Sequence, residues 1–127
     1  MQYTRVHMDA IGYELAPVVV TSEELEERLA PLYARLHFSE GQLAALTGIQ
    51  ERRWWERDFP LSRGAVMAAR KALDKSHVAP QDLGAVLYTG VNREHFEPAT
   101  ACRVAAELGT SPSAAVYDLS NACLGTL

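Results

Sequence analysis

The residues best suited to chemistry in this chain of 127 residues lie in the segment Asp118-Leu-Ser-Asn-Ala-Cys123-Leu-Gly125. The apolar run before it predicts a buried strand that ends near Asp118, and the apolar residues after Cys123 favour the start of a helix. A helix N-terminus favours a thiolate over a thiol, and its backbone N–H groups can receive an oxyanion. The pattern is therefore typical of a cysteine nucleophile, with Gly125 leaving room for close backbone approach. The alternative is that Cys123 is a small buried hydrophobe.

The second cysteine, Cys102, lies in the helical pattern of Ala-Cys-Arg-Val-Ala-Ala and is expected to pack in the core. Two cysteines are too few for a disulfide framework, which indicates a reducing compartment and a cytoplasmic protein. No Cys/His spacing suits zinc, and the chain has no Gly-x-Gly-x-x-Gly pattern for a dinucleotide. We therefore expect neither a metal site nor a permanently bound cofactor.

The composition excludes several classes of protein. The chain is 48% hydrophobic and 22% charged, which is ordinary for a soluble globular domain. Its net charge of −4 argues against nucleic-acid binding, and no apolar run approaches the roughly 18 residues of a membrane span. Residues 51–75 are locally basic and could meet a phosphate or an acidic partner; the alternative is a solvated helix face.

The first half of the chain shows a strand pattern and then two helical patterns. Alternation over Tyr3–Gly12 predicts a half-buried strand. Thr21 and Glu24 have the spacing of a capping box, and Pro31 is expected to break or kink the helix that follows. Four leucines at helical spacing are expected to face the core: Leu25, Leu29, Leu32 and Leu36. A second helix is predicted to begin at Ser39, with Gln42 completing another capping box, and to end at Gly48.

The second half alternates helices with short apolar strands. A helix is predicted over Leu61–Ser76, a buried strand over Gly84–Gly90, and a helix over Glu97–Leu108 that Gly109 ends. The strand over Ala114–Asp118 completes the series. This order predicts an α/β fold with a mainly parallel sheet, and no linker divides residues 1–127.

Three segments carry a resemblance to a known family. They are Thr47-Gly-Ile-Gln-Glu-Arg-Arg53, Glu97-Pro-Ala-Thr-Ala-Cys-Arg103 and Tyr117-Asp-Leu-Ser-Asn-Ala-Cys-Leu-Gly125. In this order they resemble the N-terminal half of a thiolase-superfamily condensing enzyme, close to 3-oxoacyl-(acyl carrier protein) synthase III. The resemblance implies one N-terminal thiolase-like half-domain over residues 1–127. It would belong to a five-layered αβαβα fold with a mixed, mainly parallel sheet, in an enzyme that is a homodimer.

The resemblance also implies a reaction. Cys123 would take an acyl group from an acyl-CoA or an acyl carrier protein thioester, and a second thioester would supply a carbanion for a Claisen condensation. Such acyltransferases serve fatty acid or long-chain ketone and olefin biosynthesis. The segment Phe96-Glu97-Pro98 resembles the acyl-CoA condensing enzyme of olefin biosynthesis, in which this glutamate acts as a base across the subunit interface. The alternative is that Glu97 is an acid in the first turn of a helix.

A difference from the family concerns the binding of coenzyme A. Synthase III proteins typically hold the nucleotide with a tryptophan and an arginine, and Gln42 and Leu46 stand at those places here. Three arginines remain as candidates for the phosphate of coenzyme A or of a carrier: Arg52, Arg53 and Arg57. The neighbouring Trp54 and Trp55 are expected to pack at a subunit or domain surface.

The family's catalytic histidine and asparagine lie in the second half of its fold. The four histidines of this chain match no catalytic position: His7, His37, His77 and His95. We therefore expect a fragment that is inactive alone and that needs a C-terminal half or a complementary chain to cover Leu124 and Leu127. The alternatives are a non-catalytic partner subunit and a fragment that binds an acyl thioester without turnover.

Overall fold

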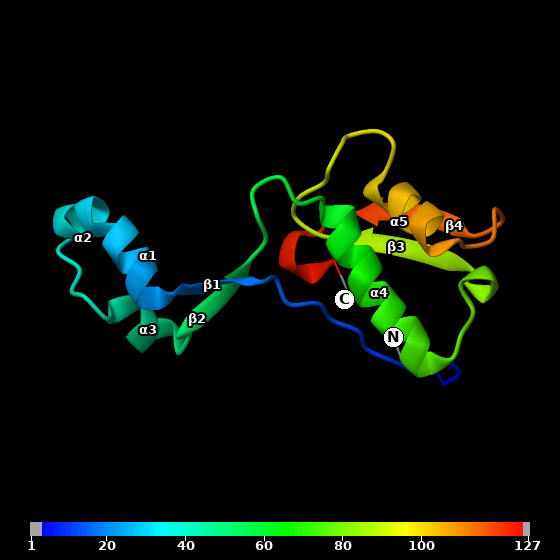
Figure 1. Cartoon of the computed structure of the whole chain (residues 1–127), viewed down its shortest axis with the longest axis horizontal. Helices are drawn as coiled ribbons and strands as arrows, with labels where there is room; N and C mark the ends of the chain where they lie inside the picture. The colour runs from blue at the N-terminus through cyan, green and yellow to red at the C-terminus, as the bar shows by residue number, and fades with distance from the viewer. Residues whose placement is uncertain (1–3, 126–127) are drawn as a thin grey trace. The chain divides into compact units, whose positions relative to one another are not determined.

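The computed structural model describes residues 4–125 of the chain (Figure 1). These residues form two units: unit 1 contains residues 4–14 and 59–125, and unit 2 is Leu15–Asp58. Each unit has buried residues of its own. The expectation of one half-domain over residues 1–127 stays a prediction.

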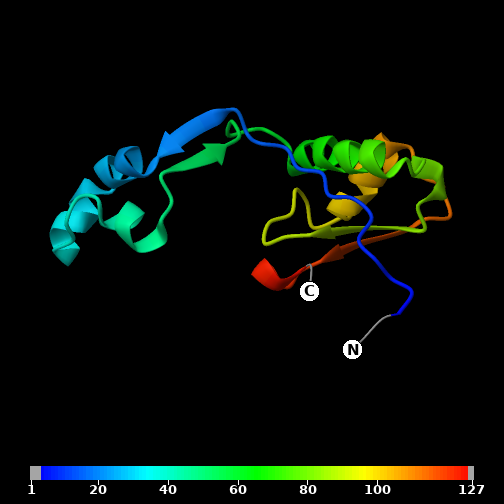
Figure 2. The same ribbon diagram turned by 90° about the horizontal axis from the view of Figure 1, so that it is seen from below.

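The sheet of unit 1 consists of β3 (Ala85–Thr89) and β4 (Ala115–Leu119), which pair in parallel from Ala85↔Ala115 to Thr89↔Leu119. Helix α5 (Thr100–Leu108) packs on both strands and α4 (Leu61–Ser76) packs on α5. Both helices lie on the same side of the strands (Figure 2). The 3-10 helix η1 (Pro80–Asp82) precedes β3. The prediction of an α/β fold with parallel strands is confirmed.

The two strands bury only one face among the described residues. Side chains that alternate onto the other face are exposed: Leu87 by 56%, Tyr117 by 57% and Leu119 by 42%. The expectation of fully buried strands is therefore wrong for residues 4–125, because α4 and α5 cover one side of the sheet.

Helix α4 has the predicted bounds, but α5 begins later than predicted. It starts at Thr100 rather than Glu97, because the Asp118 carboxylate accepts hydrogen bonds from the backbone N–H groups of Thr100 and Ala101, both at 2.8 Å. Gly109 ends the helix in a left-handed conformation, as predicted. Cys102 is exposed, so its predicted core position is wrong. The buried residues of α5 are Thr100, Ala101, Val104 and Ala105.

The N-terminal segment does not form the predicted strand in its described part, residues 4–12. It instead lies against α4. A Cβ added to Gly12 would stand 2.1 Å from the carbonyl oxygen of Ala68. Lys75 donates a hydrogen bond to the carbonyl of Ile11 at 3.0 Å, and Lys71 pairs with Glu14 at 2.8 Å. These contacts with a helix take the place of a partner strand.

Unit 2 contains a pair of antiparallel strands that the sequence patterns did not indicate. Strand β1 (Val18–Thr21) pairs antiparallel with β2 (Glu51–Trp54). Three short helices lie between them: α1 (Ser22–Arg28), α2 (Ala30–Leu36) and α3 (Gln42–Thr47). No helix within residues 4–125 combines the length and the apolar composition that crossing a membrane requires.

The helix ends of unit 2 follow the predicted signals in part. Thr21 and Glu24 form the predicted capping box. The helix is interrupted at Leu29, between α1 and α2, just before Pro31, as predicted. Helix α3 starts at Gln42 with Gly41 as its N-cap, three residues after the predicted Ser39. Gly48 ends it in a left-handed conformation, as predicted.

The predicted leucine face is not a core in this unit. Leu25 is half-buried, but Leu29, Leu32 and Leu36 are exposed by 39%, 43% and 50%. The buried residues are Ala16, Val20, Ser22 and Glu26. Helical spacing identifies the apolar face of a helix, but it does not indicate which other element packs against that face.

Candidate functional site

The carboxyl ends of β3 and β4 bring the two proposed catalytic segments to one edge of the sheet. Because the strands are parallel and Thr89 pairs with Leu119, the loop 90–99 and the segment 120–125 leave the same edge. Both views place them at the same end of the two strands (Figure 1, Figure 2). Glu97 lies in the first segment and Cys123 in the second. Ligands of open α/β sheets characteristically bind at this edge.

Cys123 lies in a tight turn. The 3-10 helix η2 (Ala122–Leu124) contains it, and its thiol is exposed. Ala122 has a φ of 46°, a left-handed conformation that is unusual for a residue with a side chain. Strained conformations of this kind cluster at functional sites.

Gly125 permits the close approach that the sequence predicts. A Cβ there would lie 2.9 Å from the Cβ of Thr89, at the end of β3. No α-helix begins after Cys123 within the described residues, so the predicted help from a helix N-terminus is not seen there. Leu124 is 50% exposed, in agreement with the expectation of an apolar face that this chain leaves uncovered, and Leu127 lies outside the described residues.

Glu97 lies on an exposed part of the loop, beside Phe96, which is 94% exposed. The peptide bond between Glu97 and Pro98 is cis. Helix α5 begins only at Thr100, and Asp118 supplies the carboxylate at its first turn. The alternative role of Glu97 as an acid in the first helical turn is therefore wrong.

Sequence reasoning missed two acids at this edge, Asp118 as a helix cap and Glu94 as an anchor of the loop. Glu94 accepts two hydrogen bonds from Ser62. The sequence did offer one signal for Glu94. Pro60 marks the start of a helix, and the free backbone N–H groups of its first turn, which includes Ser62, need an acceptor.

These two acids also act on Tyr88. Burial, and then the charges of Asp118 and Glu94, raise the pKa of the Tyr88 hydroxyl, which donates a hydrogen bond to the carbonyl of Asn92 at 3.2 Å.

The three candidate phosphate ligands lie in unit 2 and do not converge. Arg52 donates to the Ser22 hydroxyl at 2.8 Å, and Arg53 pairs with Glu51 at 3.1 Å. Arg57 follows β2 and is exposed. Trp54 is 41% exposed, and the guanidinium of Arg28 lies 5.5 Å from its ring centre.

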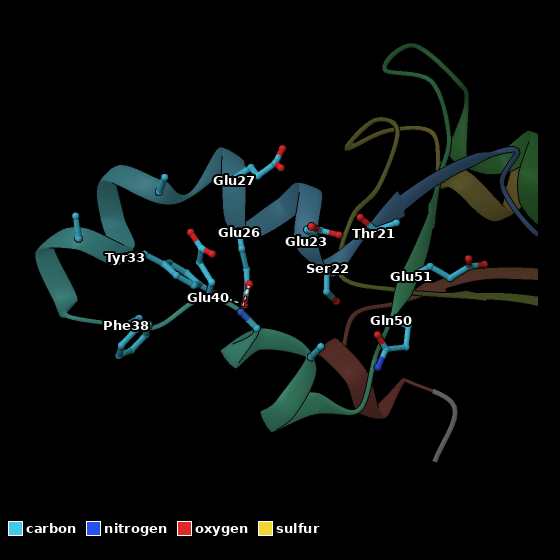
Figure 3. A pocket seen from close by; sticks show the side chains of 14 residues that line it. Thr21, Ser22, Glu23, Glu26, Glu27, Tyr33, Phe38, Glu40, Gln50 and Glu51 are labelled. Carbon is cyan, nitrogen blue, oxygen red and sulfur yellow. Dashed lines mark hydrogen bonds between the residues drawn. The ribbon is translucent and has the colours of Figure 1, made fainter.

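A hollow of about 870 Å³ lies among the helices of unit 2 (Figure 3). Five carboxylates line it: Glu23, Glu26, Glu27, Glu40 and Glu51. Negative lining repels phosphate, so this hollow does not suit the nucleotide end of coenzyme A. Within residues 4–125, no group of three or more His, Cys, Asp or Glu side chains could hold a metal ion.

Glu26 is the buried member of that lining. It is 7% exposed and accepts hydrogen bonds from the backbone N–H groups of Gly41 and Leu43, both at 2.6 Å. The Tyr33 hydroxyl adds a bond of 3.3 Å. The backbone bonds from Leu43 and Gly41 hold the pKa of Glu26 below its usual value, although burial acts in the opposite direction. Glu26 therefore connects α1 to α2 and to the start of α3.

The chain is similar to acyl-CoA:acyl-CoA alkyltransferases over its whole length. It is 59% identical over 127 residues to an acyl-CoA:acyl-CoA alkyltransferase of Shewanella oneidensis, covering 36% of that protein. It is 37% identical over 124 residues to the protein of the same name from Xanthomonas campestris pv. campestris, covering 98% of the chain and 37% of that protein. The chain is homologous to condensing enzymes of the thiolase superfamily. No protein-family model matches the chain.

Solved structures support the same conclusion for the fold. The cerulenin-bound OleA of Xanthomonas campestris aligns with a TM-score of 0.82 and 37% identity, over 91% of this chain and 33% of that one. The 3-oxoacyl-(acyl carrier protein) synthase III of Xanthomonas oryzae pv. oryzae aligns equally, at 0.82 and 36%, over 91% of this chain and 34% of that one. The resemblance and the thiolase-like fold are confirmed, and the chain spans about a third of the length of these relatives.

Proposed function

We propose that this chain forms the acyl-accepting part of an acyltransferase that makes carbon–carbon bonds by Claisen condensation of two acyl thioesters. The observation that carries the proposal is the 59% identity, over all 127 residues, to an acyl-CoA:acyl-CoA alkyltransferase. The exposure of both Glu97 and the Cys123 thiol supports it, because a base that serves the neighbouring subunit and a nucleophile that receives an acyl thioester must both be accessible.

The first half-reaction belongs to Cys123. Its thiolate attacks the carbonyl carbon of an acyl thioester, and the tetrahedral intermediate collapses with cleavage of the original C–S bond. The departing thiolate of coenzyme A or of the carrier protein takes up a proton. The acyl group is then held on Cys123 as a new thioester.

The second half-reaction belongs to Glu97. Its carboxylate removes a proton from the α-carbon of a second acyl thioester, and the carbanion attacks the carbonyl of the acyl group on Cys123. The new C–C bond forms as the C–S bond breaks, which returns the Cys123 thiolate and releases a 3-oxoacyl thioester. A base is required here because no decarboxylation supplies the carbanion.

The partners follow from the resemblance. In a homodimer, Glu97 would serve the active site of the neighbouring subunit. A histidine and an asparagine would come from a C-terminal half or a complementary chain. The enzyme would be cytoplasmic, would serve fatty acid or long-chain lipid biosynthesis, and would use its acyl thioesters as substrates without a resident cofactor. Arg52, Arg53 and Arg57 remain the candidates for phosphate contact.

Intact mass spectrometry tests the proposal. The full-length protein that contains this sequence is measured before and after exposure to a long-chain acyl-CoA, with Cys123→Ala and Cys102→Ser beside the wild type. Cys102 is a matched control because both thiols are exposed. We expect one acyl adduct on the wild type and on Cys102→Ser, and none on Cys123→Ala.

Other outcomes decide against the proposal. An adduct that persists in Cys123→Ala would show that the nucleophile is another group. Acyl-CoA binding without an adduct, unchanged in Cys123→Ala, would favour a binding fragment.

A further inference from the structure

The loop that carries Glu97 is fixed by a buried acid that the proposed chemistry does not use. One carboxylate oxygen of Glu94 accepts hydrogen bonds from both the backbone N–H and the hydroxyl of Ser62, each at 2.8 Å. Ser62 is completely buried at the start of α4. The base of the loop is thereby attached to the N-terminus of a helix.

The other carboxylate oxygen of Glu94 faces α5. Arg103 lies 3.6 Å from it, and the Glu94 side chain is only 9% exposed. The Glu94 backbone N–H also donates to the Thr100 hydroxyl at 3.4 Å. Burial alone would raise the pKa of Glu94, but the bonds from Ser62 and the charge of Arg103 outweigh it, so the pKa is lowered. The anchor is therefore an ionised carboxylate between α4 and α5.

The neighbouring residue ties the loop to the segment of Cys123. The Arg93 guanidinium donates a hydrogen bond to the hydroxyl of Ser120, which lies between β4 and Cys123. Beyond these two attachments, Phe96 and Glu97 extend into solvent. The loop thus has a fixed base and an exposed tip.

We propose that Glu94 is a positioning residue for the condensation step, because it holds the base of the loop from which Glu97 projects. The inference rests on the proposed function of Glu97. Glu94 does not touch the reacting atoms, and it leaves acyl transfer to Cys123 unchanged. A displacement of about 1 Å at a reacting group can cost on the order of a hundredfold in rate.

The variants are made in the full-length protein that contains this sequence. Glu94→Ala removes the acceptor of Ser62, whereas Glu94→Gln keeps an acceptor oxygen and removes the charge. The matched control is Glu107→Ala, which removes the other carboxylate beside Arg103, at 3.1 Å on the exposed surface of α5. Arg93→Ala cuts the tie to Ser120 without disturbing a buried group, and it serves if Glu94→Ala does not fold.

Three quantities are measured: the acyl adduct on Cys123, the rate of condensation, and hydrogen–deuterium exchange of residues 90–99. We expect Glu94→Ala to form the adduct at the wild-type rate, to lose about tenfold or more in condensation, and to exchange faster over 90–99. Glu94→Gln should recover part of the condensation rate, Arg93→Ala should show the same split, and Glu107→Ala should match the wild type.

Wild-type condensation in Glu94→Ala would overturn the inference. An equal loss of adduct and condensation would overturn it as well, because that result indicates a general structural role. If the wild type forms no adduct, the proposed function fails and the positioning role fails with it. The exchange of residues 90–99 then still decides separately whether Glu94 anchors the loop.

Discussion

At the scale of single residues, Glu97 is an exposed carboxylate on a loop whose neighbouring helix is capped by a different acid. We predict that Glu97→Gln, which keeps the shape of the side chain but cannot accept the α-proton, leaves acyl transfer to Cys123 intact. Condensation should fall by a factor on the order of 10² to 10⁴, the range for loss of a general base. Product formation and the intact mass of the acyl-enzyme measure the two steps separately in the complete enzyme.

The control for this substitution is Asp82→Asn, which alters an exposed acid in η1. It should leave both steps unchanged. Condensation at the wild-type rate in Glu97→Gln would show that Glu97 is not the base. Loss of the acyl adduct would instead show that Glu97 acts in the first step, acyl transfer to Cys123.

The sequence indicated Cys123 and Glu97 but not the acids that support them. The first two could be found because a local pattern and a family motif surround each residue. Glu94 and Asp118 have their partners 32 and 17 or 18 residues away, so their roles exist only after the helices and strands have packed. The predicted core position of Cys102 was wrong for a related reason, since helical periodicity alone did not indicate which face of α5 packs against the sheet.

At the scale of elements, Glu26 links the three helices of unit 2 through buried hydrogen bonds. We predict that Glu26→Gln destabilises unit 2 at neutral pH. The folded pKa of Glu26 is lowered, so its stabilisation is fully present above the unfolded value of about 4.3 and is lost as the pH falls through the folded value. The difference between wild type and variant should therefore shrink below about pH 4.

Urea unfolding at a series of pH values measures this difference. Glu27→Gln is the matched control, because Glu27 is an exposed acid in the same helix. A difference that stays constant down to acid pH would mean that the ionised form of Glu26 is not the stabilising one.

The N-terminal segment and α4 approach each other closely at one glycine. A Cβ on Gly12 would meet backbone atoms, at 2.1 Å from the Ala68 oxygen and 2.5 Å from the Ala72 nitrogen. Backbone atoms of a helix cannot move out of the way as a flexible side chain can. We therefore predict that Gly12→Ala lowers the free energy of unfolding by about 1–3 kcal/mol. Urea unfolding provides the measurement.

Gly84→Ala is the matched control, since nothing lies within 4 Å of its added Cβ. It should be neutral or slightly stabilising. If Gly12→Ala were equally neutral, the segment would not lie against α4 in solution.

The elements were predictable where their signals are local. The bounds of α4 and the glycine ends of α3 and α5 follow from composition and caps, and β3 and β4 follow from short apolar runs between turns. Strand pairing is not local. Residues 4–12 alternate like a strand but have no strand partner in the described part of the chain, while β1 and β2 pair across about thirty intervening residues.

At the scale of the whole molecule, apolar side chains lie uncovered in both units. The outer face of β3 and β4 exposes Leu87 and Tyr117, and α2 exposes Leu32 and Leu36. Large apolar side chains that lie exposed next to one another are typical of surfaces that contact a further element or partner. Since the relatives are about three times as long as this chain, the rest of such a protein could supply the cover. The sequence indicated the fold class, but which apolar side chains are buried depends on packing between elements, which local patterns do not specify.

The two units have separate buried sets, which gives a last prediction about their stability. Unit 2 buries Ala16, Val20, Ser22 and Glu26, whereas the buried side chains of unit 1 connect α4 and α5 above the sheet. Helices as short as those of unit 2 are marginal without packing. We therefore expect the amides of α2 and α3 to exchange with deuterium before those of α4 and α5, measured by mass spectrometry on residues 1–127.

Paired core substitutions show whether the units unfold independently. Val20→Ala should speed exchange only in unit 2, and Val66→Ala only in unit 1, because each removes about 2 kcal/mol of packing from its own unit. If either variant speeds exchange in both units, residues 1–127 unfold as one cooperative half-domain. Because local opening at low free energy is confined to weakly packed regions, the pattern of exchange distinguishes the two cases without a structure of the complete enzyme.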